Sequence, residues 1–591
     1  MQQRYLFSIL LCFLIAGKAG AQATETYTWW SPAANAFPVL EGQTWPKEVK
    51  SFYDRLPARA EQTVRKEVWN LSRHSAGLYI KFRTNSSNIV VRYGVTSKGS
   101  FAMPHMPATG VSGVDLYAVD HSGNWVWAPA QYHFSDTVTY RYANIEVDRQ
   151  FKGRDCEFRL FLPLYNAVSW MEIGVPEGNT FIPMPLSEEK PVVIYGTSIA
   201  QGGCASRPGM AWTAILERQL DYPLINLGFS GNGRLEKPVI DLMTEIDAKI
   251  YVLDCLPNLV NTPEKELETK IREAVKGLQA KRPSTPILLV EHSLGAHSGI
   301  INAKRVEDCE RSSKILRQTF AELKNEGIEN IYILSNAALG MDINSTVDGS
   351  HPTDLGMKQH ADAYTKIIRE IVHEPANPAY STTQPVIQSR DGYDWRARHN
   401  AIIELNKKSP PRNVIIANSI IHYWAGEPKA PIARGAESWS RYLAPLDLRN
   451  MAFGWDRIEN ALWRVYHGAL NGYTAKHGVV MIGTNNLSTN SNDEIIAGLK
   501  GLVEAVQLRQ PRAAILLSGI FPRRDMEKRV KEINEAITKL AAAMKITYIN
   551  PGRVFLNTSG KIDESLFSDG LHPNAAGYNK LAPVLAGYLK K

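Results

Sequence analysis

The feature that most constrains the fold is a repeated interval between a serine and a short histidine motif. The chain reads Asp-Gly-x-His-Pro at Asp348 and again at Asp569, each time just before a helix-like terminal segment. A serine that follows a buried-looking apolar run lies 153 positions before each histidine (198 to 351, and 419 to 572). Two equal intervals predict two copies of one folding unit.

Both copies show the pattern of a parallel sheet covered by helices. Continuous apolar runs alternate with amphipathic stretches such as 264–281, which is typical of buried parallel strands with crossover helices. We therefore predict two three-layer α/β/α domains, over residues 186–373 and 412–591. Between them, residues 374–411 begin with a stretch rich in Pro, Ser and Thr that predicts a linker. The runs are PVVIYG, PLINLG, KIYVLD, PILLVE and NIYILS, then NVIIAN, HGVVMIG, AAILLSG and KITYIN.

The region before the first domain has a different periodicity. Residues 22–185 contain short runs that alternate apolar and polar side chains, such as LYIKFRT and TVTYRYANIEV. Such runs predict antiparallel strands, and several of them at short spacing indicate a β-sandwich of the jelly-roll kind. Residues 1–21 combine Arg4, an apolar run and Ala-Gly-Ala, which predicts a cleaved signal peptide and a periplasmic or secreted protein.

Composition narrows the classes of partner. The net charge is +8 with no run of Lys or Arg, so a nucleic-acid surface is not expected. After the leader no apolar stretch is long enough to predict a membrane span. No motif of metal-ligand spacing occurs, so neither a metal nor another cofactor is expected. Cys204 and Cys255 follow predicted strands near the first serine, and both a disulfide and two buried thiols remain open. The oligomeric state is not indicated.

The residue types point to acyl transfer. A serine hydroxyl needs a neighbouring base, and a carboxylate must orient that base, so Ser198 with His351 and Asp348, and Ser419 with His572 and Asp569, form two candidate triads. The carboxyl ends of parallel strands, where these residues would meet, are the usual ligand crevice.

A tetrahedral intermediate also needs hydrogen-bond donors for its oxyanion. Gly231 and Asn258 follow the next strands of the first domain, and Trp455 and Asn485 hold the matching places in the second. Arg207 and His422 lie near the serines in sequence and are candidates for substrate contact.

The ordered Ser, Gly, Asn and His blocks resemble the SGNH/GDSL hydrolase family. The second unit, with FGWDRIENALWR and MIGTNN, is similar to the platelet-activating-factor-acetylhydrolase-like branch. GVDLY, from Gly113, resembles a Gly-x-Asp-Leu-Tyr jelly-roll module found before another bacterial branch. The chain departs from the family where Gly-Asp-Ser becomes Gly-Thr-Ser at Ser198 and Ala-Asn-Ser at Ser419, and where Trp455 takes the place of the oxyanion glycine.

This resemblance implies a serine esterase acting on an O-acetylated glycan. The tandem layout resembles two-domain bacterial sialate O-acetylesterases, so a sialate O-acetylesterase is the leading expectation. A plant-polysaccharide (xylan or pectin) acetyl or methyl esterase is the alternative enzyme. In a third hypothesis, one unit is a non-catalytic glycan-binding domain.

Overall fold

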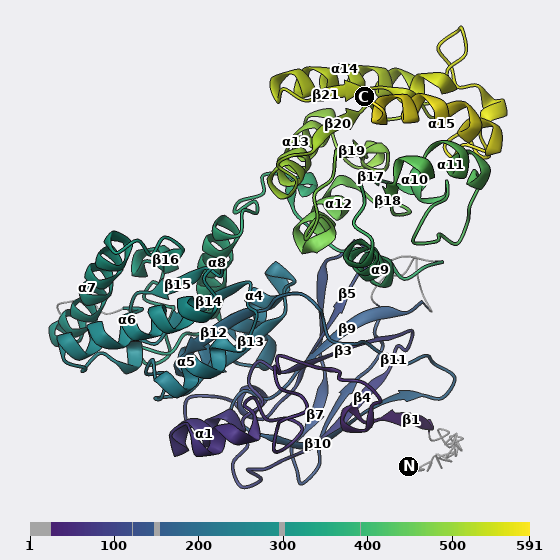
Figure 1. The fold of residues 1–591 in the computed structure, drawn as a ribbon. Helices are drawn as coiled ribbons and strands as arrows, with labels where there is room; N and C mark the ends of the chain where they lie inside the picture. Colours follow the sequence, from purple (N-terminus) through teal and green to yellow (C-terminus); the bar gives the residue numbers. More distant parts are fainter. Residues whose placement is uncertain (1–24, 121, 147–153, 295–301, 390–391) are drawn as a thin grey trace, which may run out of the picture.

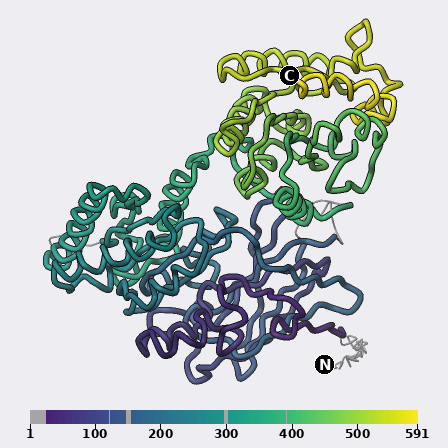
Figure 2. The backbone as a smooth tube through the Cα atoms, viewed as in Figure 1, coloured from purple at the N-terminus to yellow at the C-terminus, as the bar shows by residue number. Residues whose placement is uncertain are grey.

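The structure is a computed structural model of the chain and describes residues 25–120, 122–146, 154–294, 302–389 and 392–591. Three bodies follow one another along the chain: a β module, a first α/β domain and a second α/β domain (Figure 1). The backbone trace shows the β module against both α/β domains, with the second domain at the far end from the N-terminus (Figure 2).

The β module consists of two antiparallel sheets that enclose one apolar core. Inward side chains of both sheets, such as Ile80, Val91, Leu116, Phe158 and Ile173, form that core. The predicted β-sandwich is confirmed. The first sheet has the order β1 (Tyr27–Trp30), β10 (Val168–Pro176), β4 (Ile89–Val95), β8 (Val138–Tyr142) and β7 (Gln131–His133); the second has β11 (Ile182–Pro183), β3 (Tyr79–Thr84), β9 (Cys156–Phe161), β5 (Asp115–Val119) and β6 (Trp125–Ala128), with β2 (Leu40–Glu41) beside β3.

The first α/β domain is a parallel five-stranded sheet between two layers of helices. Alternate strand residues face opposite cores: Val193 and Tyr195 point to one, and Val192 and Ile194 to the other. The order is β13 (Leu224–Gly228), β12 (Val192–Gly196), β14 (Ile250–Asp254), β15 (Ile287–Val290) and β16 (Ile331–Leu334); helices α5 (Lys237–Thr244), α6 (Glu264–Lys281) and α7 (Ala303–Asn325) cover one face, and α4 (Trp212–Leu220) and α8 (Asp354–Ile371) the other.

The second α/β domain repeats this architecture, as predicted. Val414 and Ile416 face one core, and Ile415 and Ala417 the other. The order is β18 (Leu448–Asn450), β17 (Asn413–Ala417), β19 (His477–Met481), β20 (Ala514–Ser518) and β21 (Thr547–Ile549); helices α12 (Ile458–Arg464), α13 (Asn492–Arg509) and α14 (Glu527–Ala543) cover one face, and α11 (Ala436–Tyr442) and α15 (Ala575–Leu589) the other.

Strand register makes the two domains comparable residue by residue. Strands β12 and β17 are the first strands of their parallel sheets in chain order. Each lies between two strands that follow it in the sequence. In such a sheet the strand order reverses at the first strand, which opens a crevice at the carboxyl ends. Gly196 pairs with Gly228 and with Asp254, and Ala417 pairs with Met481. These pairings fix the equivalent positions used below.

The segment expected to be a linker is only partly irregular. Residues 395–408 form α9 (Trp395–Lys408), and Trp395 and Ile402 belong to the core of the second domain. The helix was missed because its neighbours Pro, Ser and Thr dominate the composition of the stretch. In Figure 1, α9 lies between the second domain and strands β5 and β9 of the β module.

A buried ion-pair cluster joins the three bodies. Arg159 of β9 contacts Glu217 and Asp221 at the end of α4, and Arg396 of α9 donates to Asp221 at 3.0 Å. The indole of Trp463, in α12, also donates to Asp221 at 3.0 Å. Because this one carboxylate of the first domain accepts hydrogen bonds from the β module and from the second domain, the cluster holds the three bodies together.

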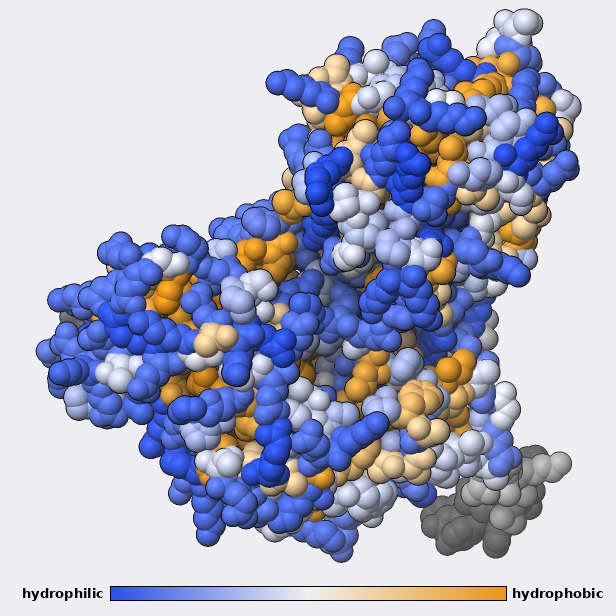
Figure 3. Space-filling model, in the orientation of Figure 1, coloured by the Kyte–Doolittle hydropathy of each residue, from blue (hydrophilic) through white to orange (hydrophobic). Residues whose placement is uncertain are grey.

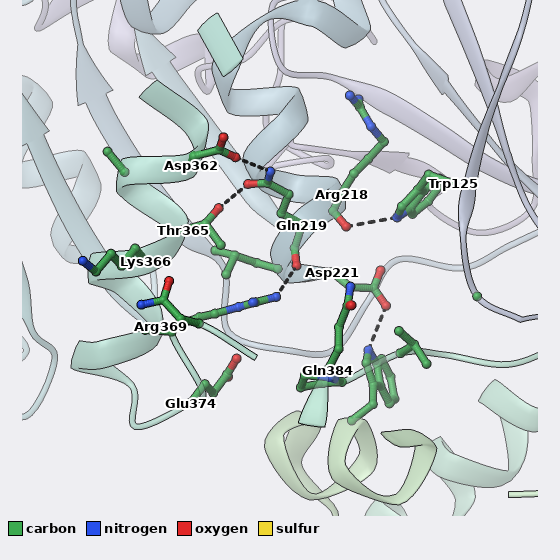
Figure 4. A pocket seen from close by; sticks show the side chains of 18 of the residues that line it. Trp125, Arg218, Gln219, Asp221, Asp362, Thr365, Lys366, Arg369, Glu374 and Gln384 are labelled. Carbon is green, nitrogen blue, oxygen red and sulfur yellow. Dashed lines mark hydrogen bonds between the residues drawn. The ribbon is translucent and has the colours of Figure 1, made fainter. Parts of the chain in front are cut away.

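A cavity of about 810 Å³ lies beside this cluster (Figure 4). Arg218, Gln219, Arg369 and Glu374 contribute to its wall, and none of the six predicted triad residues does. Figure 3 shows one face of the molecule as mostly hydrophilic, with apolar side chains in small separate patches. Within the described ranges, no helix is both long and apolar enough to cross a bilayer.

Candidate active sites

Each candidate nucleophile is the first residue of a short helix that directly follows β12 or β17. Thr197 caps α3 (Ser198–Gln201) and Asn418 caps α10 (Ser419–His422), each accepting from a backbone N–H one residue past the serine. Short oxygen-bearing side chains are favoured as caps. This explains why the residue before the serine changes between the copies while the turn is kept.

Each histidine lies in a tight loop just before the last helix of its domain. The loops close through antiparallel bridges, Thr346 with Pro352 and Phe567 with Pro573. The glycine of the repeated motif has a positive φ in both copies, 80° at Gly349 and 78° at Gly570. Such a conformation favours glycine, so the Asp-Gly pair sets the shape of the loop.

The structure brings each serine, histidine and aspartate together. In the first domain, Ser198 Oγ is 2.8 Å from His351 Nε2, and His351 Nδ1 is 2.7 Å from Asp348 Oδ2. Both serines are mostly covered, with 9% of Ser198 and 4% of Ser419 exposed.

The second domain repeats these distances. Ser419 Oγ is 2.8 Å from His572 Nε2, and His572 Nδ1 is 2.7 Å from Asp569 Oδ2. In this arrangement the imidazole Nδ1–H donates to the carboxylate, which leaves Nε2 free to accept the serine proton.

Both aspartates are held in the ionised form. Burial raises the pKa of Asp348, but hydrogen bonds from the backbone N–H and ring of His351 outweigh it and lower the pKa to about 2. The same balance, with His572 and Leu571 as donors, lowers the pKa of Asp569 to about 2. Each carboxylate can therefore stabilise an imidazolium throughout the neutral range.

Gly231 and Trp455 occupy equivalent positions, because each lies two residues after a backbone N–H that donates to the last residue of β12 or β17, Phe229 to Gly196 and Phe453 to Ala417. Both have a positive φ, 71° and 65°. Glycine adopts this conformation freely, whereas tryptophan does so at some cost, so the turn is conserved in shape although the side chain is not. The side chain of Trp455 is 65% exposed.

Asn258 and Asn485 are also equivalent, each four residues after its paired strand position. Asn258 Oδ1 accepts from the Gly233 backbone at 3.0 Å, and Asn485 Nδ2 donates to the Asp456 carbonyl at 2.9 Å. Both amides are thus anchored to the turn that contains Gly231 or Trp455. One backbone N–H and one side-chain amide are therefore the predicted oxyanion donors in each domain.

The two residues suggested for substrate contact have other partners. His422 is 0% exposed, and its Nδ1 accepts from the Gly454 backbone at 2.9 Å, so the proposed substrate contact is corrected: burial removes the ring from reach. Arg207 forms an ion pair with Asp115 and bonds Tyr117, both in the Gly-x-Asp-Leu-Tyr motif of the β module. Its guanidinium thereby joins the module to the first domain.

The two cysteines near the first serine, Cys204 and Cys255, are free thiols. Cys204 and Cys255 are buried and unbridged, which decides between the two alternatives left open by the sequence. Burial, with the nearby Asp348 charge, raises the pKa of Cys204 to about 12. A thiol held protonated does not compete with Ser198 as a nucleophile. Among the described residues, no cluster of three His, Cys, Asp or Glu side chains has the geometry of a metal site.

Residues of the β module border the first site, and no sequence motif indicated them. The ring of His105 lies 6.0 Å from that of His351, and Tyr165 donates its hydroxyl to the Ser198 carbonyl at 3.3 Å. In the second domain Tyr423 lies 5.7 Å from His572, ring to ring. The first site is therefore built by two bodies, because the module supplies part of its rim.

Comparison with known families agrees with this architecture. Residues 189–369 and residues 418–580 each match a family described as "GDSL-like Lipase/Acylhydrolase family". Residues 27–181 match a family described as "N-terminus of Esterase_SGNH_hydro-type". The fold and the matches define a carboxylic ester hydrolase with tandem SGNH domains.

A solved structure is similar over a large part of the chain. A protein from Bacteroides ovatus ATCC 8483, described as a GDSL-like lipase, is 30% identical with a TM-score of 0.53, over 59% of this chain and 98% of that one. The chain belongs to the GDSL-like lipase/acylhydrolase family.

Curated relatives are more distant. Platelet-activating factor acetylhydrolase IB subunit alpha1 of Rattus norvegicus is 27% identical over 223 residues, 36% of this chain and 90% of that protein. The Homo sapiens protein of the same name is 26% identical over 218 residues, with 36% and 90% covered.

Proposed function

We propose that the protein is an exported serine O-acetylesterase with two active sites, and that its substrates are O-acetylated glycans, sialic acids first among them. The observation that carries the proposal is the second complete serine–histidine–aspartate arrangement, with the same contact distances as the first. A decayed copy would have no reason to keep all three side chains in hydrogen-bonding geometry.

The mechanism follows from the contacts. His351 or His572 takes the serine proton as Oγ attacks the ester carbonyl, and the paired aspartate stabilises the imidazolium. The tetrahedral oxyanion receives hydrogen bonds from the Gly231 or Trp455 backbone and from Asn258 or Asn485. As the intermediate collapses, its bond to the sugar oxygen breaks, and the imidazolium protonates that oxygen so that the sugar leaves with a free hydroxyl. Water, deprotonated by the same histidine, releases acetate from the acyl-serine.

Several features support a small acyl group on a sugar. The serines are mostly covered, which favours a short acyl chain, and the curated relatives are named acetylhydrolases. The exposed indole of Trp455 offers an aromatic surface of the kind on which a sugar ring can pack. The tandem layout resembles sialate O-acetylesterases, and the net charge of +8 is compatible with a carboxylated sugar. The leader-like N-terminus supports export.

The test is acetate release from defined substrates by four proteins: wild type, Ser198→Ala, Ser419→Ala and the double variant. O-acetylated sialoglycans, acetylated xylan and acetylated or methylated pectin form the panel. Each single variant should retain part of the activity on a sialoglycan, and the double variant should lose it. Hydrolysis of xylan or pectin esters alone would replace the sialate assignment with a plant-polysaccharide esterase. Full activity in Ser419→Ala would assign the second domain a non-catalytic role.

A further inference from the structure

The residue three positions after each serine forms a hydrogen bond with the turn that contains Gly231 or Trp455, which is called the oxyanion turn below. In the first domain this residue is Gln201, whose Oε1 accepts from the Ser230 backbone N–H at 3.0 Å. In the second it is His422, whose Nδ1 accepts from the Gly454 backbone N–H at 2.9 Å. Ser230 and Gly454 directly precede Gly231 and Trp455, so unlike side chains make the same contact at the same place.

These contacts join the two parts of each site that must hold a fixed separation. Gln201 and His422 end the helices that carry the serines, and they bond the turns that carry the oxyanion N–H. A tetrahedral intermediate needs its oxygen about 2.7–3.1 Å from each donor while its carbon is bonded to Oγ. We propose that Gln201 and His422 are positioning residues that set the oxyanion turn relative to the nucleophile.

The surroundings of each side chain preserve its acceptor role. Gln201 Nε2 donates to the Leu164 carbonyl at 3.1 Å and lies 3.2 Å from His74 Nδ1, so the amide is oriented with its oxygen toward the turn. His422 is enclosed by Tyr393, Tyr423 and Phe453. Burial, with Arg398 and Arg464 nearby, lowers the pKa of His422 to about 2, so its ring stays neutral and Nδ1 remains an acceptor.

The inference rests on the proposed two-site esterase, and the duplicate domains provide its test. Ser198→Ala leaves the second site as the reporter, with p-nitrophenyl acetate as the substrate. In that protein His422→Phe keeps an aromatic ring but removes the acceptor, and His422→Gln installs the side chain of the first domain. We expect His422→Phe to lower kcat at least about 10-fold with KM within about 3-fold, because the lost donor alignment acts in the transition state.

Rescue distinguishes positioning from packing. His422→Gln should return kcat to within about 3-fold of the Ser198→Ala parent, although glutamine fills the aromatic pocket less well than phenylalanine. The pH dependence of kcat/KM should keep its acid limb in all these proteins, because His572 and Asp569 are untouched. His477→Phe is the matched control: this buried histidine bonds Asn413 at the opposite end of β19 and should not change kcat.

The first domain gives an independent arm in Ser419→Ala. Gln201→Leu should lower kcat to a similar extent, and Gln43→Leu, at a buried glutamine of the β module, should not. Circular dichroism establishes that each variant is folded. Folded Phe and Leu variants with parental kcat would overturn the positioning role, as would equal losses in His422→Phe and His422→Gln. An inactive single-serine parent, by contrast, would count against the proposed function of that domain.

Discussion

Arg55 and Arg398 bind equivalent backbone carbonyls in the two α/β domains, although they come from unrelated elements. Arg55, from the β module, donates Nη1 to the carbonyls of residues 226 and 228, at 2.9 and 3.0 Å. Arg398, from α9, donates to the carbonyls of residues 450 and 452, at 3.3 and 3.0 Å. These carbonyls end β13 and β18, where the chain turns toward the oxyanion position. Each turn is thus braced by an arginine from outside its sheet.

Replacement of either arginine should damage one site and spare the other. Arg55→Met leaves several buried carbonyls without a donor, which costs about 2–4 kcal/mol of unfolding free energy and loosens the first turn. In a Ser419→Ala background the rate on p-nitrophenyl acetate should fall at least about 10-fold. Arg398→Met in the same background should leave that rate within about 2-fold. Reversal of the pattern in Ser198→Ala completes the comparison, and equal effects of both arginines on both sites would contradict separate bracing.

The orienting aspartates should be essential to rate but not to folding. Asp569→Asn offers an amide where the imidazole needs a carboxylate, so the ring loses its tautomer and kcat at the second site should fall about 10³–10⁴-fold. The same change at Asp348 should silence the first site. Single-serine backgrounds and acetate release measure each effect. A loss smaller than 10-fold would show that the histidine is oriented by another group.

The depressed pKa of these aspartates also predicts a pH dependence. A carboxyl whose folded pKa is about 2 contributes stability above its unfolded value, and that stability is lost as the pH falls through the folded pKa. Between pH 5 and pH 9 both carboxylates stay ionised, so we expect neither aspartate to cause an inflection of kcat/KM in this range. An inflection between pH 5 and pH 9 that disappears in the Asn variants would contradict this expectation.

The raised pKa of Asp254 predicts a pH dependence of stability opposite in sign to that of Asp348 and Asp569. Burial raises the pKa of this carboxyl to about 6, against a hydrogen bond from Tyr364 at 3.0 Å. From pH 4 to pH 6 the unfolded chain ionises while the folded carboxyl stays protonated, so stability falls as the pH rises. Asp254→Asn should therefore gain stability relative to wild type, up to about 3 kcal/mol at pH 7 and near zero at pH 4. Thermal unfolding at the two pH values measures the difference, and a gain independent of pH would refute it.

The ion-pair cluster at the junction predicts a strong effect of Asp221. Removing this carboxylate deprives the buried Arg159 and the mostly covered Arg396 of one of the two carboxylates that they share, the other being Glu157, so Asp221→Ala should cost about 3 kcal/mol. Hydrogen exchange should increase first in α9, where the second domain meets the β module. Asp362→Ala, at an exposed pair with Lys358, is the matched control and should change stability by less than about 0.5 kcal/mol. Unchanged exchange in α9 of Asp221→Ala would show that other contacts hold the junction.

Local patterns were sufficient for the repeated parts of the fold and of the sites. Continuous apolar runs predicted the parallel strands because strands covered on both faces have no polar side. The equal intervals predicted which serine meets which histidine, since a doubly wound sheet brings its first and last carboxyl-end loops to one crevice. Gly231 and Trp455 could be matched by their places in the ordered Ser, Gly, Asn and His blocks, and the structure gives both residues a positive φ.

Contacts between distant segments could not be read in the same way. Arg55 lies about 170 residues before the carbonyls that it binds, and no periodicity connects it with them. His105 comes from a loop of the β module, and its place beside His351 can be recognised only in the folded structure. His422 is a candidate for substrate contact because it follows Ser419 closely in the sequence, but in the structure its ring is fully buried. Sequence proximity to a nucleophile does not specify on which side of the helix a side chain lies.

The position of α9 decides how the second catalytic half can be excised as an autonomous fragment. A polypeptide cut at Arg412, where the strand pattern restarts, would omit Trp395, Ile402 and the guanidinium that braces the turn. A cut at Tyr393 would retain all three and would still leave the ion partners of Arg396 behind, on Glu157 and Asp221. A fragment of the second half therefore has to include α9, and the positive charge of Arg396, which loses Glu157 and Asp221 in such a fragment, has to be removed or paired anew.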